Sequence, residues 1–273
     1  MNLQYSATYK NITCNITGTT VQTAELIVPK NTGVFIESKR IISSTSCTSG
    51  KTDWAAEVKS MPTASRQKEM PKTRQWAANI SRTISALQSG EDPLFTFEKS
   101  NTNGSSITVD SHVVGQLLVI TPADGKIIFR QGALLLCAYE EGATIAMKQT
   151  VVTGKPELGE ADAFRAEHLG MRYECRIIGE AIVVLEIQGD WRKIELDSEN
   201  PKKMGIRVDP RKFVARSSNV KLVSFPNSAS DQATRTNIGR NRDLYLEAKP
   251  GTGKGIVYLA SQVQEDHNSS QED

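Results

Sequence analysis

Cysteine and histidine are scarce in this chain of 273 residues, with four copies of one and three of the other. No Cys-x-x-Cys pair occurs, and the histidines lack the His-x-His or His-x₃-His spacing of a metal site on a β-strand scaffold. We therefore expect reduced structural cysteines and no metal or other cofactor. The residues concerned are Cys14, Cys47, Cys137, Cys175, His112, His168 and His267.

Long apolar runs and an excess of one charge are also missing. The longest apolar run, Ala133–Tyr139, is far shorter than the roughly 20 residues of a transmembrane helix. The first residues contain no basic stretch followed by an apolar one, so we expect no targeting signal and a cytoplasmic protein. The formal net charge is only +2, so any electrostatic binding must depend on local clusters.

Short β-branched runs dominate what is present. Runs such as Ala24–Val28, Gln116–Ile120 and Ala181–Ile187 are separated by Gly, Pro, Asn or Asp. This pattern is typical of sandwiches and barrels and predicts an all-β fold.

One segment departs from the β pattern. Trp76, Ile80, Ile84 and Leu87 form an apolar stripe at helical spacing, so we predict a partly helical insertion at residues 51–90. The last residues, 264–273, carry four acids and no base, which favours a disordered tail.

An internal repeat gives the strongest signal. Three segments share a glycine, a short strand that ends in an apolar residue, and an apolar pair five and six positions later. We expect each segment to be a strand, a tight turn and a returning strand whose apolar pair faces two buried sides. The predicted units are residues 1–50, 91–160 and 161–263, and the segments are Gly33–Ile42, Gly125–Leu135 and Gly205–Val214.

The third unit carries a resemblance to a known family. Gly179–Trp191, Val208–Pro210 and Gly253–Ser261 are similar to the core and closing strand of the altered inheritance of mitochondria, member twenty-four, family. Gly179 is followed by Glu180 and Ala181 where the family prefers a second glycine, so the chain resembles a divergent member.

The resemblance implies a fold and a role. It implies three repeats of a double-stranded β-helix kind, related to the tryptophan RNA-binding attenuation protein, and it fits a ring-like trimer. It implies no enzyme activity. Eukaryotic relatives help to organise the mitochondrial inner membrane, which makes a mitochondrial location the alternative to a cytoplasmic one.

The sequence contains no convincing catalytic motif. The loop Pro250–Gly255 lacks the first glycine, the hydroxyl residue and the following helix of a phosphate-binding loop, so we interpret it as a hairpin turn. Cys137 lies within an apolar strand, which favours burial over a nucleophilic role. We therefore predict that the protein is not an enzyme.

Two local excesses of basic residues are candidate interaction surfaces for phosphate groups or anionic lipid. Only Trp191 and Phe213 are interleaved with the second cluster, so nucleic acid is the less favoured partner. The candidate residues are Lys51, Arg66, Lys68, Lys72, Arg74 and Arg82 in the first cluster, and Arg192, Lys193, Lys202, Lys203, Arg207, Arg211 and Lys212 in the second.

These observations predict a non-enzymatic scaffold or interaction protein. Self-association is expected because a β-repeat array leaves edge strands that symmetric closure would cover. Peripheral membrane association and an unidentified protein partner fit this role. The rival hypothesis is a small-ligand or RNA-binding module, by analogy of fold with the attenuation protein.

Overall fold

A computed structural model describes residues 3–37, 40–50, 95–139, 144–153, 163–165, 173–225 and 243–262, and it confirms the all-β prediction. The described elements are strands and short 3-10 turns, among them η3 (Pro122–Asp124), η4 (Gln131–Ala133) and η7 (Pro210–Lys212). The predicted insertion at 51–90 and tail at 264–273 lie outside these residues. A helix long and apolar enough to span a bilayer is not found in the part of the chain described.

The strands form four sheets, which we name A to D. Sheet A has the order β1 (Leu3–Tyr9), β2 (Ile12–Thr17), β3 (Thr23–Val28), β8 (Ser105–Asp110), β5 (Ile41–Thr45). Sheet B has the order β6 (Cys47–Gly50), β7 (Phe95–Ser100), β4 (Gly33–Glu37), β11 (Leu134–Tyr139), β16 (Ala181–Gln188), β9 (Gly115–Ile120).

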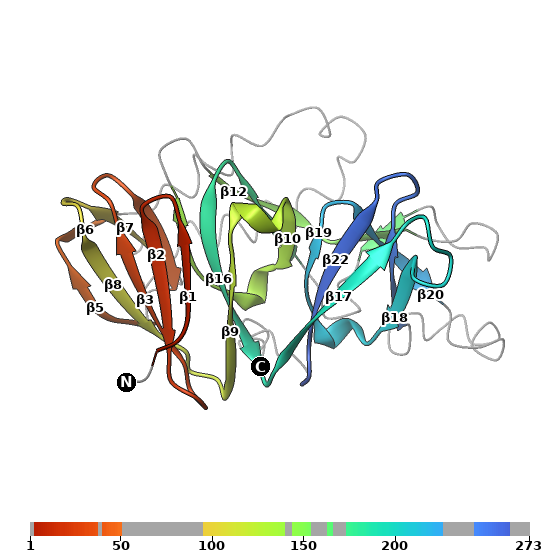
Figure 1. The fold of residues 1–273 in the computed structure, drawn as a ribbon, viewed down its shortest axis with the longest axis horizontal. Coiled ribbons are helices and arrows are strands. Elements are labelled where there is room, and N and C mark those ends of the chain that lie inside the picture. The colour runs from red at the N-terminus through yellow and green to blue at the C-terminus, as the bar shows by residue number, and fades with distance from the viewer. Residues whose placement is uncertain are drawn as a thin grey trace.

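The other two sheets complete the described part of the structure (Figure 1). Sheet C has the order β12 (Thr144–Gln149), β15 (Tyr173–Ile178), β10 (Ile127–Arg130), β19 (Phe213–Ser217), β22 (Lys254–Ala260), β17 (Trp191–Asp197). Sheet D has the order β14 (Ala163–Arg165), β13 (Val151–Thr153), β20 (Val220–Phe225), β21 (Asp243–Ala248), β18 (Gly205–Val208).

The sheets stack in the order A, B, C, D, and one hydrophobic core fills each space between neighbours. The A–B core contains Leu26 and Ile182, the B–C core Phe129 and Val183, and the C–D core Phe213. Sheets B and C are therefore buried on both faces, whereas A and D each bury one.

The sequence of each strand reflects this position. In β16 seven consecutive residues are buried, because both faces of sheet B meet a core. In β2 buried residues alternate with partly exposed ones, because sheet A meets only sheet B. The patterns that predicted strands therefore also distinguish central from outer sheets.

A unit of six strands occurs three times among the described strands. The units run from β3 to β8, from β9 to β16 and from β17 to β22, with β13 and β14 inserted in the second. In each unit the first, third and sixth strands lie in one sheet, and the second, fourth and fifth lie in the next. Sheets B and C each combine three strands of one unit with three of the following unit.

The predicted repeat segments are the second and third strands of these units, but they are not hairpins. β4, β10 and β18 each pass to a third strand in the adjacent sheet, so the turn is a corner between two layers. The loop Pro250–Gly255 likewise joins β21 in sheet D to β22 in sheet C, with positive φ at Gly251 and Gly253. The hairpin interpretation was wrong because local sequence does not specify which strand is paired.

Each apolar pair lies at a β-bulge. Each third strand has a register shift at the same place, between Ile41 and Ser43, Leu134 and Leu136, or Phe213 and Ala215. Successive side chains of a strand point to opposite faces, and the bulge then places the next residue, Leu136 or Ala215, on the same face as the second member of the pair. Thus Leu134 enters the B–C core while Leu135 enters the A–B core, and Phe213 and Val214 divide in the same way between the C–D and B–C cores.

The first apolar pair differs from the other two. Ile41 packs against the A–B core, but Ile42 is 58% exposed. The position of Ile42 points away from sheet B, where no earlier sheet of the described structure covers sheet A. The prediction of two buried faces therefore holds for the second and third pairs and fails for the first.

The boundaries of the repeat units in the structure differ from the predicted ones. β7 and β8 were expected in a second unit at 91–160, but they pair within sheets B and A as the fifth and sixth strands of the first unit. The second unit extends from β9 to β16, at residues 115–188. The description as a double-stranded β-helix remains a prediction.

Leu135→Ala and Ile42→Ala test whether two equivalent positions of the repeat differ in burial, as the order of the sheets requires. Leu135 is fully buried, so its truncation should lower the free energy of unfolding by about 2–5 kcal/mol. Ile42→Ala should change it by less than about 0.5 kcal/mol. Equilibrium urea unfolding measures both, and equal losses would contradict the assignment of Ile42 to an open face.

Candidate interaction surface

The structure describes one of the two predicted basic clusters. Lys51, Arg66, Lys68, Lys72, Arg74 and Arg82 lie outside the described residues. The seven residues of the second cluster are described, and we call them the basic edge: Arg192, Lys193, Lys202, Lys203, Arg207, Arg211 and Lys212.

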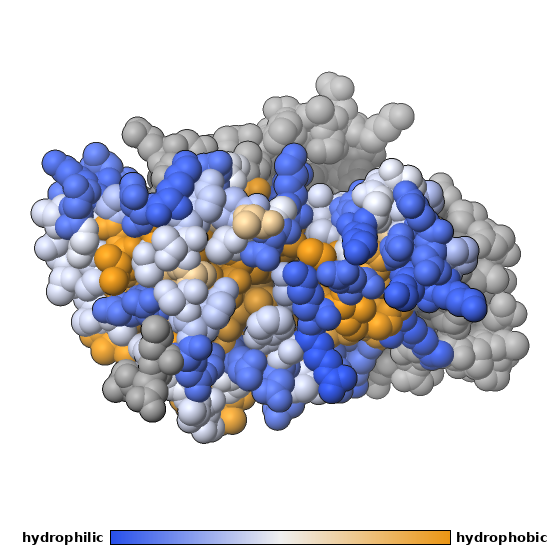
Figure 2. Space-filling view, viewed as in Figure 1, coloured by the Kyte–Doolittle hydropathy of each residue, from blue (hydrophilic) through white to orange (hydrophobic). Residues whose placement is uncertain are grey.

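Two edge strands and their connection carry five residues of the basic edge. β17 is the last strand of sheet C and carries Arg192 and Lys193, while β18 is the last strand of sheet D and carries Arg207. The β17–β18 turn supplies Lys202 and Lys203. Hydrophilic residues gather over this part of the molecule in the space-filling view (Figure 2). Arg192, Lys193, Lys202, Lys203 and Arg207 therefore lie on the β17–β18 side of the C–D sandwich, whereas Arg211 and Lys212 lie on η7, which leads into β19 inside sheet C.

Four acids reduce the charge of this surface without cancelling it. Glu195, Asp197, Glu199 and Asp209 lie on the same elements as the seven basic residues. Asp209 accepts hydrogen bonds from the Arg211 guanidinium at 3.1 and 2.9 Å. These bonds lower the pKa of the Asp209 carboxyl and raise the pKa of Arg211, so both stay charged near neutral pH.

The aromatic residues interleaved with the basic edge do not offer a stacking platform. Trp191 packs edge-on against Tyr258 at a centroid distance of 6.0 Å, and Phe213 is fully buried in the C–D core. The contacts available to a ligand along this edge are therefore charges and hydrogen-bond donors.

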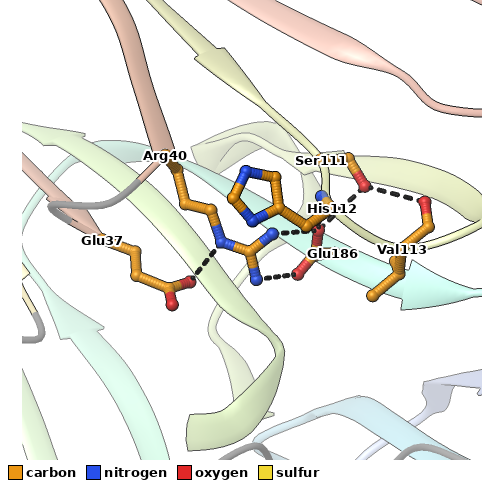
Figure 3. A network of polar contacts seen from close by, with 6 residues as sticks. All are labelled: Glu37, Arg40, Ser111, His112, Val113 and Glu186. Carbon is orange, nitrogen blue, oxygen red and sulfur yellow. Dashed lines mark hydrogen bonds and ion pairs between the residues drawn. The ribbon is translucent and has the colours of Figure 1, made fainter.

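A buried ion pair joins the first two repeat units (Figure 3). Arg40, in the β4–β5 corner, donates through Nη1 and Nη2 to Glu186 Oε1 and Oε2 at 3.3 and 3.1 Å. Arg40 Nε donates to Glu37 Oε2 at 3.1 Å. Only 5% of Arg40 and 7% of Glu186 are exposed, so the pair is shielded from water.

The remaining acceptor capacity of Glu186 is used by the segment after β8. Ser111 Oγ donates to Glu186 Oε1 at 2.8 Å, and the His112 backbone N–H donates to the same oxygen at 3.0 Å. Two N–H groups of the Arg40 guanidinium and two neutral donors therefore surround one carboxylate. This geometry fixes the end of the first unit against β16 of the second and leaves the imidazole of His112 outside the network.

A second buried ion pair lies in sheet C. Arg216 on β19 donates through Nε and Nη2 to the two carboxylate oxygens of Glu174 on β15, both at 3.0 Å. Arg216 Nη1 also donates to the Val220 carbonyl. This pair connects the third unit to the second across β10. The repeat boundaries are thus joined by charged pairs as well as by sheet hydrogen bonds.

Sequence reasoning missed both ion pairs. Glu186 interrupts the apolar run Ala181–Ile187, and a charge within a run that is otherwise buried is a signal for a buried ion pair. The sequence contains no feature that identifies Arg40, 146 residues away, as its partner.

Burial suppresses the ionisation of two of the four thiols. Burial raises the pKa of Cys14 and of Cys175 to about 12, so at neutral pH almost none of either thiol is ionised. Cys137 is fully buried, as predicted for a thiol in an apolar strand. Cys47 is partly exposed, and its Sγ lies 3.4 Å from the Thr45 carbonyl. Among the described residues, no three His, Cys, Asp or Glu side chains gather in a potential metal site.

A small cleft opens between η3 and the end of the B–C sandwich. It has a volume of about 170 Å³, and its lining includes Ile120, Ile127, Phe129 and Val183 with Lys126. Ligand sites usually measure about 300–1,000 Å³. The cleft therefore has room only for a group of a few atoms.

Comparisons with known proteins support the fold. No family model and no curated protein matches the chain. A solved structure, the protein SPYM3_0169 from Streptococcus pyogenes, is similar with a TM-score of 0.58 and 14% sequence identity. The similarity covers 92% of this chain and 94% of that protein. At this identity the match shows a shared fold.

Glu186→Ala tests whether the buried pair joins the units. Removal of the carboxylate leaves Arg40 buried without its main partner and should lower the free energy of unfolding by about 3–5 kcal/mol. The double variant Arg40→Met with Glu186→Leu should lose less free energy of unfolding than the sum of the losses of Arg40→Met alone and Glu186→Leu alone. Glu25→Ala, at a partly exposed position, is the matched control. Urea unfolding would contradict the assignment if Glu186→Ala matched this control.

Proposed function

We propose that this protein is a non-enzymatic scaffold that self-associates and binds an anionic surface through its basic edge. The observation that carries the proposal is the placement of five basic residues on β17, on β18 and on the turn between them, with Arg211 and Lys212 on η7 after β18. Four acids on these elements leave a local positive excess. The chain as a whole has a net charge of only +2.

Location on edge strands makes these charges suitable for binding. Arg192 and Lys193 project from β17, and Lys202 and Lys203 from the following turn, all at exposed positions. Charged residues also protect sheet edges from unwanted pairing. Both roles are compatible, because a flat anionic surface contacts side chains without forming a β-ladder.

An anionic lipid surface is favoured over nucleic acid. Trp191 packs against Tyr258 and Phe213 is buried, so the two aromatic residues interleaved with the basic residues do not form a base-stacking platform. Attraction to lipid headgroups needs only clustered charge. The resemblance to a family whose eukaryotic relatives organise a mitochondrial membrane supports the same choice. The cleft beside η3 holds only a few atoms, so this part of the described structure does not favour the small-ligand alternative.

The test is co-sedimentation with vesicles that contain phosphatidylserine, in 0.1 M salt. We expect the full chain to bind these vesicles and not pure phosphatidylcholine vesicles. Changing Arg192, Lys193, Lys202 and Lys203 to Gln should weaken binding by about two to three orders of magnitude, because each basic residue near an anionic membrane contributes about 1 kcal/mol.

A matched variant controls for the loss of net charge. Lys30, Lys99, Lys126 and Arg176 are also exposed, lie away from the basic edge, and are changed to Gln together. This variant should retain most of the binding. Equal losses in the two variants would contradict a role for the basic edge. Binding of polyuridylate instead of vesicles, with the same dependence on the basic edge, would show a nucleic-acid partner.

A further inference from the structure

The same joint connects successive repeat units twice within this chain. In sheet B the second strand of the first unit, β4, pairs with the third strand of the second unit, β11. In sheet C the second strand of the second unit, β10, pairs with the third strand of the third unit, β19. Both joints are antiparallel.

The register of the two joints is identical. Ile36 lies opposite Leu136, and Phe129 lies opposite Ala215. In each case the apolar residue that ends the motif's first strand lies opposite a residue of the next unit. That residue comes two positions after the first member of the next unit's apolar pair, which is Leu134 or Phe213. The following pairs, Phe35 with Cys137 and Ile128 with Arg216, keep the same offset.

At each end of the array, one strand of such a joint lacks its partner strand among the described strands. β18 is the second strand of the third unit and pairs only with β21 among the described strands. β5 is the third strand of the first unit and pairs only with β8 among them. Figure 1 shows β5 at one end of the long axis and β18 toward the other. One chain therefore carries both complementary edges, but they lie far apart.

The exposed side of β5 has the features of an edge that is normally covered. Its residues, from Ile41 to Thr45, include no charge and no proline, the usual devices that protect an edge strand. Ile42 is 58% exposed, whereas Leu135 and Val214 are fully buried at the equivalent positions of the joints in sheets B and C. Of the third strands β5, β11 and β19, β5 is the one without a joint among the described strands. It is also the one whose second apolar residue is exposed.

We propose that β18 of one copy of the chain pairs antiparallel with β5 of a second copy and so repeats the internal joint between molecules. The shared register places Val208 opposite Ser43 of the second copy, Arg207 opposite Ser44, and Ile206 opposite Thr45. Because two different edges meet, the contact is heterologous and generates a closed ring or a filament. The inference rests on the self-association in the proposed function and identifies the surfaces that form it.

The outer face of sheet A limits the contact to this edge. Ser6, Asn15 and Glu25 form a hydrogen-bonded row across β1, β2 and β3, with distances of 2.9 and 3.3 Å. A polar face of this kind ends the stacking of sheets. A second copy is therefore added by strand pairing at β5, with Ile42 at the rim of the contact.

Charge substitutions opposite each other test the register. Ser44 and Arg207 are both exposed, so changes there should leave each copy folded. S44K places a second cation opposite Arg207 and should raise the dissociation constant for association about five-fold, whereas S44D should lower it by a similar factor. Combining S44K with R207E should restore association. Light scattering after size-exclusion chromatography across a dilution series gives these constants, and thermal melting verifies folding.

Disulfide mapping distinguishes this joint from other pairings. We would mix S44C protein with R207C protein, oxidise the mixture, and identify the cross-links by mass spectrometry. The proposed joint predicts a disulfide between the two variants. Cross-links only between two S44C chains would overturn it in favour of a symmetric β5 contact.

The outcomes separate this inference from the proposed function. Association of the wild-type chain that is unaffected by S44K, S44D and R207E would overturn the joint and retain self-association through another surface. A wild-type chain that stays monomeric at all concentrations would overturn both the joint and the self-association. Vesicle binding by such a monomer would still support the role of the basic edge.

Discussion

Burial of both faces of sheets B and C is the constraint on which the rest of the structure depends. A sheet with two apolar faces is stable only when a layer covers each face, so A and D are needed on either side. The corners between second and third strands satisfy this need by carrying the chain between layers. Successive side chains of each third strand, such as Leu134 and Leu135, then enter separate cores.

The charged pairs add specificity to this layered packing. Hydrophobic burial alone does not fix how one repeat unit sits on the next, since similar strands recur in each. The bidentate contacts of Arg40 with Glu186 and of Arg216 with Glu174 are geometrically demanding and lie where units meet. Because a buried carboxylate without its partner is costly, these pairs disfavour alternative registers between units.

The ends of the array explain where the protein can meet partners. Outer faces of sheets A and D are polar or partly exposed, so stacking stops there, while edges remain. The edge formed by β17 and β18 is rich in basic residues, and the edge at β5 is neutral with an exposed Ile42. Recognition of an anionic surface uses β17 and the β17–β18 turn, whereas pairing with a second copy uses β18 and β5, so the two contacts meet at Arg207.

The sequence by itself determined the all-β class, the three recurring strand segments, the burial of Cys137 and the clustering of basic residues between positions 192 and 212. These follow from local pattern, because strand periodicity and turn residues act over a few positions. Only the tertiary structure decided which sheet each strand joins, the unit boundaries, the exposure of Ile42 and the pairing of Arg40 with Glu186. Those features depend on contacts between residues far apart in the chain, which no local pattern specifies.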